Sequence, residues 1–278
     1  MNEVLVPPPL AKETKPKGPR GPYQPRYIRP KRTEVSFIWE DLDYHLLELL
    51  SDFDTLTIKQ TLLLLPAETY RHVSERFQML WSAGEIERLQ GLPRGECAYR
   101  LKKGKQLPHR LARADMHLCV EQFVRAHPAF QYEWENEAVY RAEAKDQVVA
   151  DARFRLWNPQ YEVRFAVEID QSWEVVLKVL AKMRGHIAMR EALMAAGTYQ
   201  PYRVLFATNN IENRLNRVLR RMAEVEESKK YPTFILYTDQ RWYQPTQDEP
   251  PATRWDRLLY APIWQSAHQR EQVALLRR

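Results

Sequence analysis

The sequence predicts an α+β protein in which a small helical unit is followed by a larger α/β domain with a mixed sheet. Apolar residues recur at helical spacing between residues 39 and 84, and two short strand-like segments follow them. Beyond residue 109 the pattern reads helix, three strands, helix, strand, helix, strand. A length of 278 residues is sufficient for two such domains, each with its own core.

Residues 1–33 form a basic, proline-rich tail. Prolines from Pro16 to Pro30 alternate with lysines and arginines, and periodic apolar residues are almost absent. A segment of this composition cannot bury enough apolar surface to offset its chain entropy, so we expect it to be disordered. Two interpretations stay open for it: an arm that lies on nucleic-acid phosphates, or a solvated tail.

Residues 34–108 show the pattern of three helices and a two-stranded hairpin. The helices are expected from Trp39 to Leu50, from Thr55 or Thr57 to Leu64, and from Pro66 to Gly84, with strands at 85–89 and 97–101. This order is typical of a winged helix-turn-helix domain. It predicts a DNA-binding unit, with a protein-contact module as the alternative.

Three arginines of this unit are the candidate DNA contacts. Arg71 and Arg76 lie on the third helix, and Arg94 lies in the wing between the two strands. Arginine reaches both phosphate oxygens and base edges, so we predict that all three bind double-stranded DNA. The net charge of +6 also favours an anionic partner.

The larger domain is expected over residues 109–245, and residues 246–278 form a tryptophan-rich extension. Its elements are expected at 110–126 (helix), 134–141, 147–157 and 161–170 (strands), 172–195 (helix), 203–208 (strand), 211–226 (helix) and 233–238 (strand). Asn158-Pro159 is a turn signal between the second and third strands. We expect Trp255 and Trp264 of the extension to pack in the core or to cover it as a lid.

Acidic residues mark the second and third strands of this domain. Asp151 lies in the second strand, whereas Glu168 and Asp170 lie in the third, where strand alternation puts them on one face about 6.6 Å apart, at roughly 3.3 Å per residue. Asp151 can approach Glu168 across the hairpin, and Lys182 follows on the next helix. Carboxylates of this kind bind Mg²⁺ or Mn²⁺, and a lysine beside them can offset charge on a phosphate.

We therefore predict Asp151, Glu168 and Lys182 as catalytic residues and Asp151, Glu168 and Asp170 as metal ligands. A third acid could also come from Glu121, Glu135 or Glu137. The competing interpretation is a solvated polar face, which is common in antiparallel sheets. His186, one turn after Lys182, is expected to be a hydrogen-bonded structural residue.

Taken together, these motifs resemble the replication-relaxation family over roughly residues 40–240. The resemblance rests on the winged-helix pattern, the segments 99–104 (YRLKKG) and 109–116 (HRLARADM), and the series Asp151, Glu168, Asp170, Lys182. Members of that family are found on plasmids and other mobile elements and are described as involved in plasmid replication or DNA relaxation. Their C-terminal half looks like the PD-(D/E)xK nuclease fold.

The resemblance implies a role for several residues. Asp151 matches the acid of the second strand, Glu168 the acid of the third, and Lys182 the family's helix lysine, while Asp170 stands where nucleases of this fold usually have their lysine. It implies a DNA-binding protein of a plasmid, phage or transposon with a metal-dependent endonuclease-like domain. Such a protein would act in replication, mobilisation or transposition, with other proteins of such a complex as further partners. The alternative is a non-catalytic adaptor or regulator that keeps the nuclease fold as a scaffold.

The sequence lacks the signatures of nucleotide-binding proteins, cysteine-based zinc proteins, membrane-spanning proteins and secreted proteins. It has no phosphate-binding glycine-rich loop, and Cys97 and Cys119 do not form a Cys-x-x-Cys pair. No apolar run approaches the roughly 20 residues of a membrane-spanning helix. Pro7, Pro8 and Pro9 interrupt the apolar segment that a signal peptide would need. We expect a cytoplasmic protein without a membrane partner.

Overall fold

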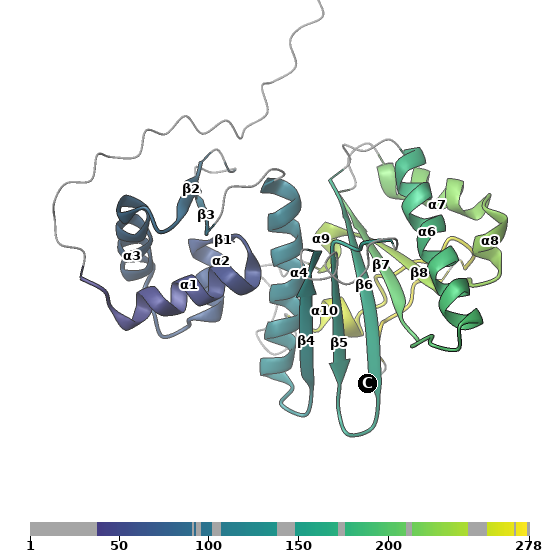
Figure 1. Cartoon of the computed structure of the whole chain (residues 1–278), viewed down its shortest axis with the longest axis horizontal. Helices are drawn as coiled ribbons and strands as arrows, with labels where there is room; N and C mark the ends of the chain where they lie inside the picture. The colour runs from purple at the N-terminus through teal and green to yellow at the C-terminus, as the bar shows by residue number, and fades with distance from the viewer. Residues whose placement is uncertain are drawn as a thin grey trace, which may run out of the picture.

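The computed structural model combines two sheets with helices packed around them. It describes residues 38–90, 92, 96–101, 107–137, 148–171, 176–209, 213–243, 255–269 and 271–276. The fold is α+β, with a three-stranded sheet near the N-terminus and a mixed five-stranded sheet in the larger domain. The long helix α4 (Leu107–Ala126) lies between the N-terminal unit and the larger sheet (Figure 1). The predicted tail, residues 1–33, lies outside the described residues.

The N-terminal unit contains the expected helices and hairpin strands. Its helices are α1 (Asp41–Phe53), α2 (Ile58–Leu64) and α3 (Tyr70–Ala83), and its strands are β1 (Leu56–Thr57), β2 (Glu87–Leu89) and β3 (Ala98–Arg100). The strands pair antiparallel in the order β1-β3-β2, so the hairpin gains a short third strand that the sequence pattern did not indicate.

Local side chains explain where these helices begin and end. Thr57 Oγ1 accepts a hydrogen bond from the Gln60 amide at 3.2 Å, and Gln60 Oε1 accepts one from the Thr57 amide at 2.8 Å. This capping box selects Thr57 over Thr55 as the start of α2. Gly84 ends α3 with φ of 92°, a left-handed conformation that glycine adopts without steric cost. The predicted end of α3 at Gly84 is therefore confirmed, whereas α3 begins at Tyr70, after its N-cap Thr69, and not directly after Pro66.

The larger sheet has five strands in sequence order. They are β4 (Gln131–Asn136), β5 (Ala152–Trp157), β6 (Glu162–Asp170), β7 (Arg203–Thr208) and β8 (Ile235–Asp239). The first three strands pair antiparallel, and β6, β7 and β8 pair parallel. The parallel connections pass through α6 (Val176–Ala195), and through α7 (Arg214–Ala223) followed by α8 (Glu226–Lys229). β4 begins three residues earlier than predicted, and residues 138–147 lie outside the described residues.

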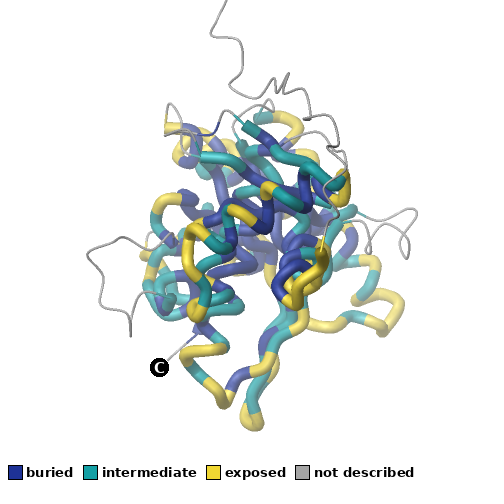
Figure 2. The backbone as a smooth tube through the Cα atoms, turned by 90° about the vertical axis from the view of Figure 1, so that its left-hand side faces the viewer, coloured by how far each residue is buried: buried dark blue, intermediate teal, exposed yellow. Residues whose placement is uncertain are grey.

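Helices cover both faces of this sheet. One face packs against α4 through residues such as Phe123, Phe154 and Val167, and the opposite face packs against α6 and α7 through residues such as Met183 and Val218. The buried segments gather in the interior in Figure 2, with exposed residues mainly at turns and on outer helix faces. Among the described residues, no helix has the length and apolar composition needed to cross a membrane.

The described part of the C-terminal extension belongs to the same core. The short helices α9 (Gln240–Tyr243) and α10 (Arg257–Tyr260) lead to Trp264, which is fully buried and forms a β-bridge with Val273. Gln265 bridges in turn to Tyr237 of β8. The expectation that Trp264 packs in the core is thus confirmed.

Aromatic rings connect the N-terminal unit to the larger sheet. The ring of Phe53, the last residue of α1, stacks on His117 of α4 with 4.1 Å between centroids. His117 stacks in turn on Trp134 of β4 at 4.3 Å. Contacts of this kind hold α1, α4 and the sheet in a defined arrangement.

Candidate functional site

Asp151 and Glu168 lie side by side where β5 begins. The register pairs Ala152 with Val167, and the amide of Asp151 donates to the Val167 carbonyl at 2.9 Å. The Asp151 carboxylate turns back to β6, because its Oδ2 accepts a hydrogen bond from the Ile169 amide at 2.7 Å. The structure therefore brings the two predicted carboxylates to the same end of the hairpin.

Helix α6 supplies the partners of Glu168. Glu168 is buried, its Oε1 lies 2.8 Å from His186 Nε2, and its Oε2 accepts a hydrogen bond from Lys182 Nζ at 3.3 Å. Lys182 and His186 are one helical turn apart, so both reach the same carboxylate. The Lys182 side chain is 35% exposed and faces solvent as well as Glu168. His186 is fully buried, and its Nδ1 has no hydrogen-bond partner among the described residues.

Helix α4 supplies the partners of Asp151. His109 Nε2 lies 3.2 Å from Asp151 Oδ1, and Arg113 Nη1 donates to the backbone carbonyl of Asp151 at 3.3 Å. Neither residue was predicted from the sequence as part of the site. The helical pattern of α4 places them on one helix, but nothing local to that helix indicates which strand end they meet.

The two carboxylates influence each other's ionisation. Burial, followed by the negative charge of Asp151, raises the pKa of Glu168 above its usual range, against the opposing effects of His186 and Lys182. Burial also raises the pKa of Asp151, but the hydrogen bond from His109, the charges of His109 and Lys182, and the Ile169 amide leave it below its usual range. Pairs of groups shifted in opposite directions occur in active sites and also in structural ion clusters.

Asp170 lies on the same face but takes part in a separate ion pair. Arg214 of α7 binds both of its oxygens, through a short contact from Nε and a 3.0 Å hydrogen bond from Nη2, and Thr208 Oγ1 donates to Oδ2 at 2.9 Å. Both charged side chains are buried. Strand alternation predicted the face correctly. It could not show that the parallel neighbour β7 and the helix after it neutralise Asp170, which takes this predicted metal ligand out of the Asp151–Glu168 pair.

The three candidates for a third acidic ligand, Glu121, Glu135 and Glu137, differ in their distance from the pair and in their partners. The Glu137 amide donates to the Asp151 carbonyl at 3.2 Å, which places this residue beside the pair. Glu135 forms an ion pair with Arg153, and Glu121 is bound by Arg125 and Tyr132. Within the described part of the chain, no group of three or more His, Cys, Asp or Glu residues is arranged to hold a metal ion.

The donor chemistry of the pair fits a hard divalent cation. Two buried carboxylates, Asp151 directly before β5 and Glu168 in β6, offer the oxygen ligands that Mg²⁺ and Mn²⁺ prefer, and their mutual repulsion would be relieved by a cation. Asp151 and Glu168 would hold it. Their oxygens are hydrogen bonded to His109, Ile169, Lys182 and His186, so a cation would compete with the side-chain donors.

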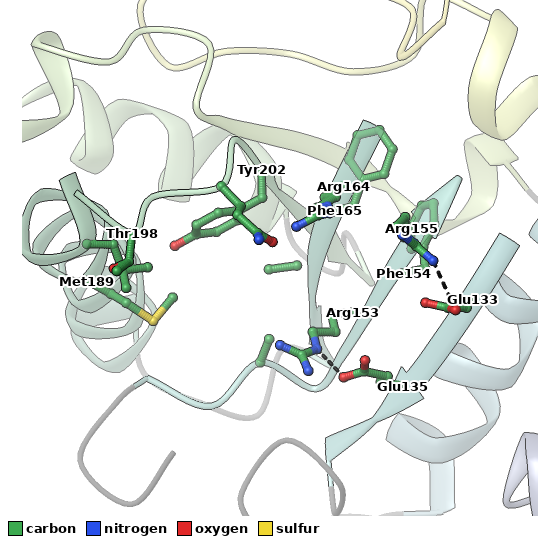
Figure 3. A pocket seen from close by; sticks show the side chains of 14 residues that line it. Glu133, Glu135, Arg153, Phe154, Arg155, Arg164, Phe165, Met189, Thr198 and Tyr202 are labelled. Atoms are coloured by element: carbon green, nitrogen blue, oxygen red, sulfur yellow. Dashed lines mark hydrogen bonds and ion pairs between the residues drawn. The ribbon is translucent and has the colours of Figure 1, made fainter. Parts of the chain in front are cut away.

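A cavity of about 510 Å³ lies on the face of the sheet that α6 covers (Figure 3), and the residues that line it include neither Asp151 nor Glu168. Ala150 and Ala166, which lie close to the two carboxylates in the sequence, help to line it. Across its floor Arg153 pairs with Glu135 and Arg155 pairs with Glu133, and the side chains of Met189, Thr198 and Tyr202 form the opposite wall. The cavity provides room for a bound group, but it reaches only the sequence neighbours of the two carboxylates.

The three predicted DNA contacts differ in their exposure. Arg71 is 89% exposed and forms an ion pair with Glu75 at 2.8 Å. Arg76 is buried and binds Asp43 and Glu40 of the α1 region, so it is not available as the DNA contact that its place on the third helix suggested. A buried arginine requires a counter-charge, and the sequence pattern could not show that Asp43 supplies it. Arg94 lies outside the described residues.

Comparison of this chain with models of known protein families, with curated proteins and with solved structures found no match.

Proposed function

We propose that this chain is a DNA-binding protein whose larger domain carries a metal-dependent centre for cleaving phosphodiesters. The observation that carries the proposal is the buried pair Asp151–Glu168 with Lys182 on one of its carboxylates. A phosphodiester resists hydrolysis strongly, so a large acceleration is needed. When bound, a divalent cation would supply most of it by neutralising developing charge and lowering the pKa of a water molecule.

Each charged residue of the site has a separate role in this proposal. Asp151 and Glu168 would hold the cation, and the partly exposed ammonium of Lys182 would contact the phosphate. His109 and His186 hold the two carboxylates in place from opposite sides of the sheet. Neighbours that orient ligating carboxylates commonly matter almost as much as the ligands.

The order of elements supports the assignment to a fold class of nucleases. Helix α4, strands β4 to β6, helix α6 and strand β7 follow the order expected for a PD-(D/E)xK-like domain, with the acids at the start of β5 and near the end of β6. The N-terminal order of three helices and a hairpin supports a winged helix. A role on a plasmid, phage or transposon rests on the resemblance to the replication-relaxation family alone.

Contact with double-stranded DNA is assigned to the exposed face of α3. Arg71 and Gln78 are exposed there, and the wing residue Arg94 is the further candidate. The second helix of a helix-turn-helix commonly enters the major groove. Arg76 is left out, because it holds α3 to α1.

The proposal is tested with supercoiled plasmid, the full-length protein, and Mg²⁺ or Mn²⁺ against an EDTA control. We expect metal-dependent nicking or linearisation that Asp151→Asn and Glu168→Gln abolish while DNA binding persists. Glu162→Gln is the matched control, because it makes the same change at the far end of β6. Absence of cleavage by the unmodified protein on supercoiled, linear and single-stranded DNA would refute the proposal.

A second candidate function is a non-catalytic DNA-binding adaptor. The observation that favours it is that all four oxygens of Asp151 and Glu168 are hydrogen bonded to groups of the protein. Such a cluster can serve as a structural ion network. In that case the protein would bind DNA as strongly with EDTA as with Mg²⁺, and calorimetry would detect no metal binding.

A further inference from the structure

We infer that Asp54, at the C-terminal end of α1, positions the carboxylate of Asp151 through Arg113 of α4, so that the N-terminal unit completes the candidate site. Asp54 belongs to the unit assigned to DNA, whereas Asp151 belongs to the larger domain. The inference builds on the proposed function, because it assigns a positioning residue to the proposed metal site.

One guanidinium connects the two aspartates. Arg113 Nη2 donates to Asp54 Oδ2 at 2.5 Å, and its Nη1 donates to the Asp151 carbonyl at 3.3 Å. Arg113 is buried, with 6% of its surface exposed. Because a buried guanidinium is stable only beside a counter-charge, the Asp54 carboxylate fixes where this cation lies. The planar fork of arginine makes the position of one contact depend on the other.

A second arginine and a histidine reinforce this connection. Arg110 Nη1 donates to Asp54 Oδ1 at 2.6 Å, so both oxygens of Asp54 are held by α4. His109 precedes Arg110 in the chain and lies 3.2 Å from Asp151 Oδ1. The first two turns of α4 thus contact Asp54 on one side and both the backbone and the carboxylate of Asp151 on the other.

The backbone of Asp54 agrees with a constraint on its side chain. Its φ is 67° and its ψ is −40°, a combination that L residues rarely adopt. Conformations of this kind persist where surrounding contacts over-determine them. Here two arginines bind the side chain, and the neighbouring Phe53 ring stacks on His117 of the same helix.

Asp54→Asn is the sharpest variant, because asparagine keeps the shape and tolerates positive φ but removes the charge. Asp41→Asn is the matched control: it makes the same change at an exposed position at the other end of α1. The Ile169 amide proton reports on Asp151 directly, since it donates to Asp151 Oδ2. Its nuclear magnetic resonance signal is read in the full-length, metal-free protein, and Mn²⁺ affinity is measured by calorimetry.

We expect Asp54→Asn to shift the Ile169 amide signal and to weaken Mn²⁺ binding by about 10- to 100-fold, the usual effect of losing a group behind a ligand. Asp41→Asn should change neither. If Asp54→Asn does not fold, Arg113→Lys takes its place, because lysine keeps the charge but cannot span both contacts; it should shift the same signal. Conversely, wild-type values of both quantities in these variants would overturn the inference.

The two proposals fail in distinguishable ways. If the wild-type protein binds Mn²⁺ and cleaves DNA while Asp54→Asn leaves the Ile169 signal and the affinity unchanged, the proposed function stands and the inference is wrong. If the wild-type protein binds no Mn²⁺, the proposed function fails. The Ile169 amide signal alone then decides whether Asp54 positions Asp151. A shift in Asp54→Asn but not in Asp41→Asn then supports the positioning role, and an unmoved signal overturns it.

Discussion

Glu168 and Asp170 occupy neighbouring positions on the same face of β6, both buried, but they are neutralised in different ways. Asp170 has one arginine that binds both of its oxygens, which gives a balanced pair of charges. Glu168 shares the single charge of Lys182 with Asp151, and the nearby histidines add positive charge only when they are protonated. The first arrangement pairs one carboxylate with one guanidinium, whereas the second brings two buried carboxylates together, and a cation between them would relieve their repulsion.

The largest effect expected from this difference concerns stability. Arg214→Met would leave Asp170 buried without its cation and should lower the free energy of unfolding by about 3–5 kcal/mol. Lys182→Met removes a partly exposed partner, and Glu168 keeps its hydrogen bond to His186, so the change should stay within about 1 kcal/mol. Denaturant unfolding of the two variants measures both values. Similar losses of unfolding free energy in the two variants would contradict the distinction between Asp170–Arg214, which stabilises the fold, and Glu168–Lys182, which belongs to the proposed site.

His117 is a buried titratable group that pairs with no carboxylate among the described residues, and it extends this comparison. Burial, followed by the positive charge of Arg113, lowers the pKa of His117 from 6.5 to about 3. As the pH falls below 6.5, the unfolded chain binds a proton that the folded protein does not take up until about pH 3. Stability from this residue is therefore present above pH 6.5 and is lost between pH 6.5 and about 3, by about 1.4 kcal/mol per pH unit.

His117→Phe keeps a ring between Phe53 and Trp134 and removes this titration. Plots of unfolding free energy against pH should thus fall less steeply for the variant than for the wild type between pH 6 and about pH 4, by close to one proton. Carboxylates titrate in both proteins, so the difference isolates His117. Parallel curves would show that the histidine is not held neutral.

The sequence predicts elements better than it predicts partners. Periodicity located β7 at residues 203–208, the Asn158-Pro159 dipeptide located the turn before β6, and capping chemistry narrowed the start of α2 to Thr55 or Thr57, of which the structure selects Thr57. These features depend on residues close together in the chain. The face shared by Glu168 and Asp170 also follows from the two-residue repeat of a strand.

The partners of the charged residues could not be predicted in the same way. Ion pairs form between Arg76 and Asp43, between Arg214 and Asp170, and between Arg113 and Asp54. The partners are 33 to 59 residues apart in the sequence. Packing of the whole core determines which helix lies next to which strand end. The residue pattern of a single helix does not contain this information. The same reason explains why His109 was missed.

The central claim is that Asp151 and Glu168 form a cation site, and calorimetric titration of the full-length protein with Mn²⁺ tests it most directly. We predict a single site in the wild type, loss of binding in Asp151→Asn and Glu168→Gln, and unchanged binding in Glu162→Gln. No binding by the wild type, or equal binding by Glu168→Gln, would contradict the account.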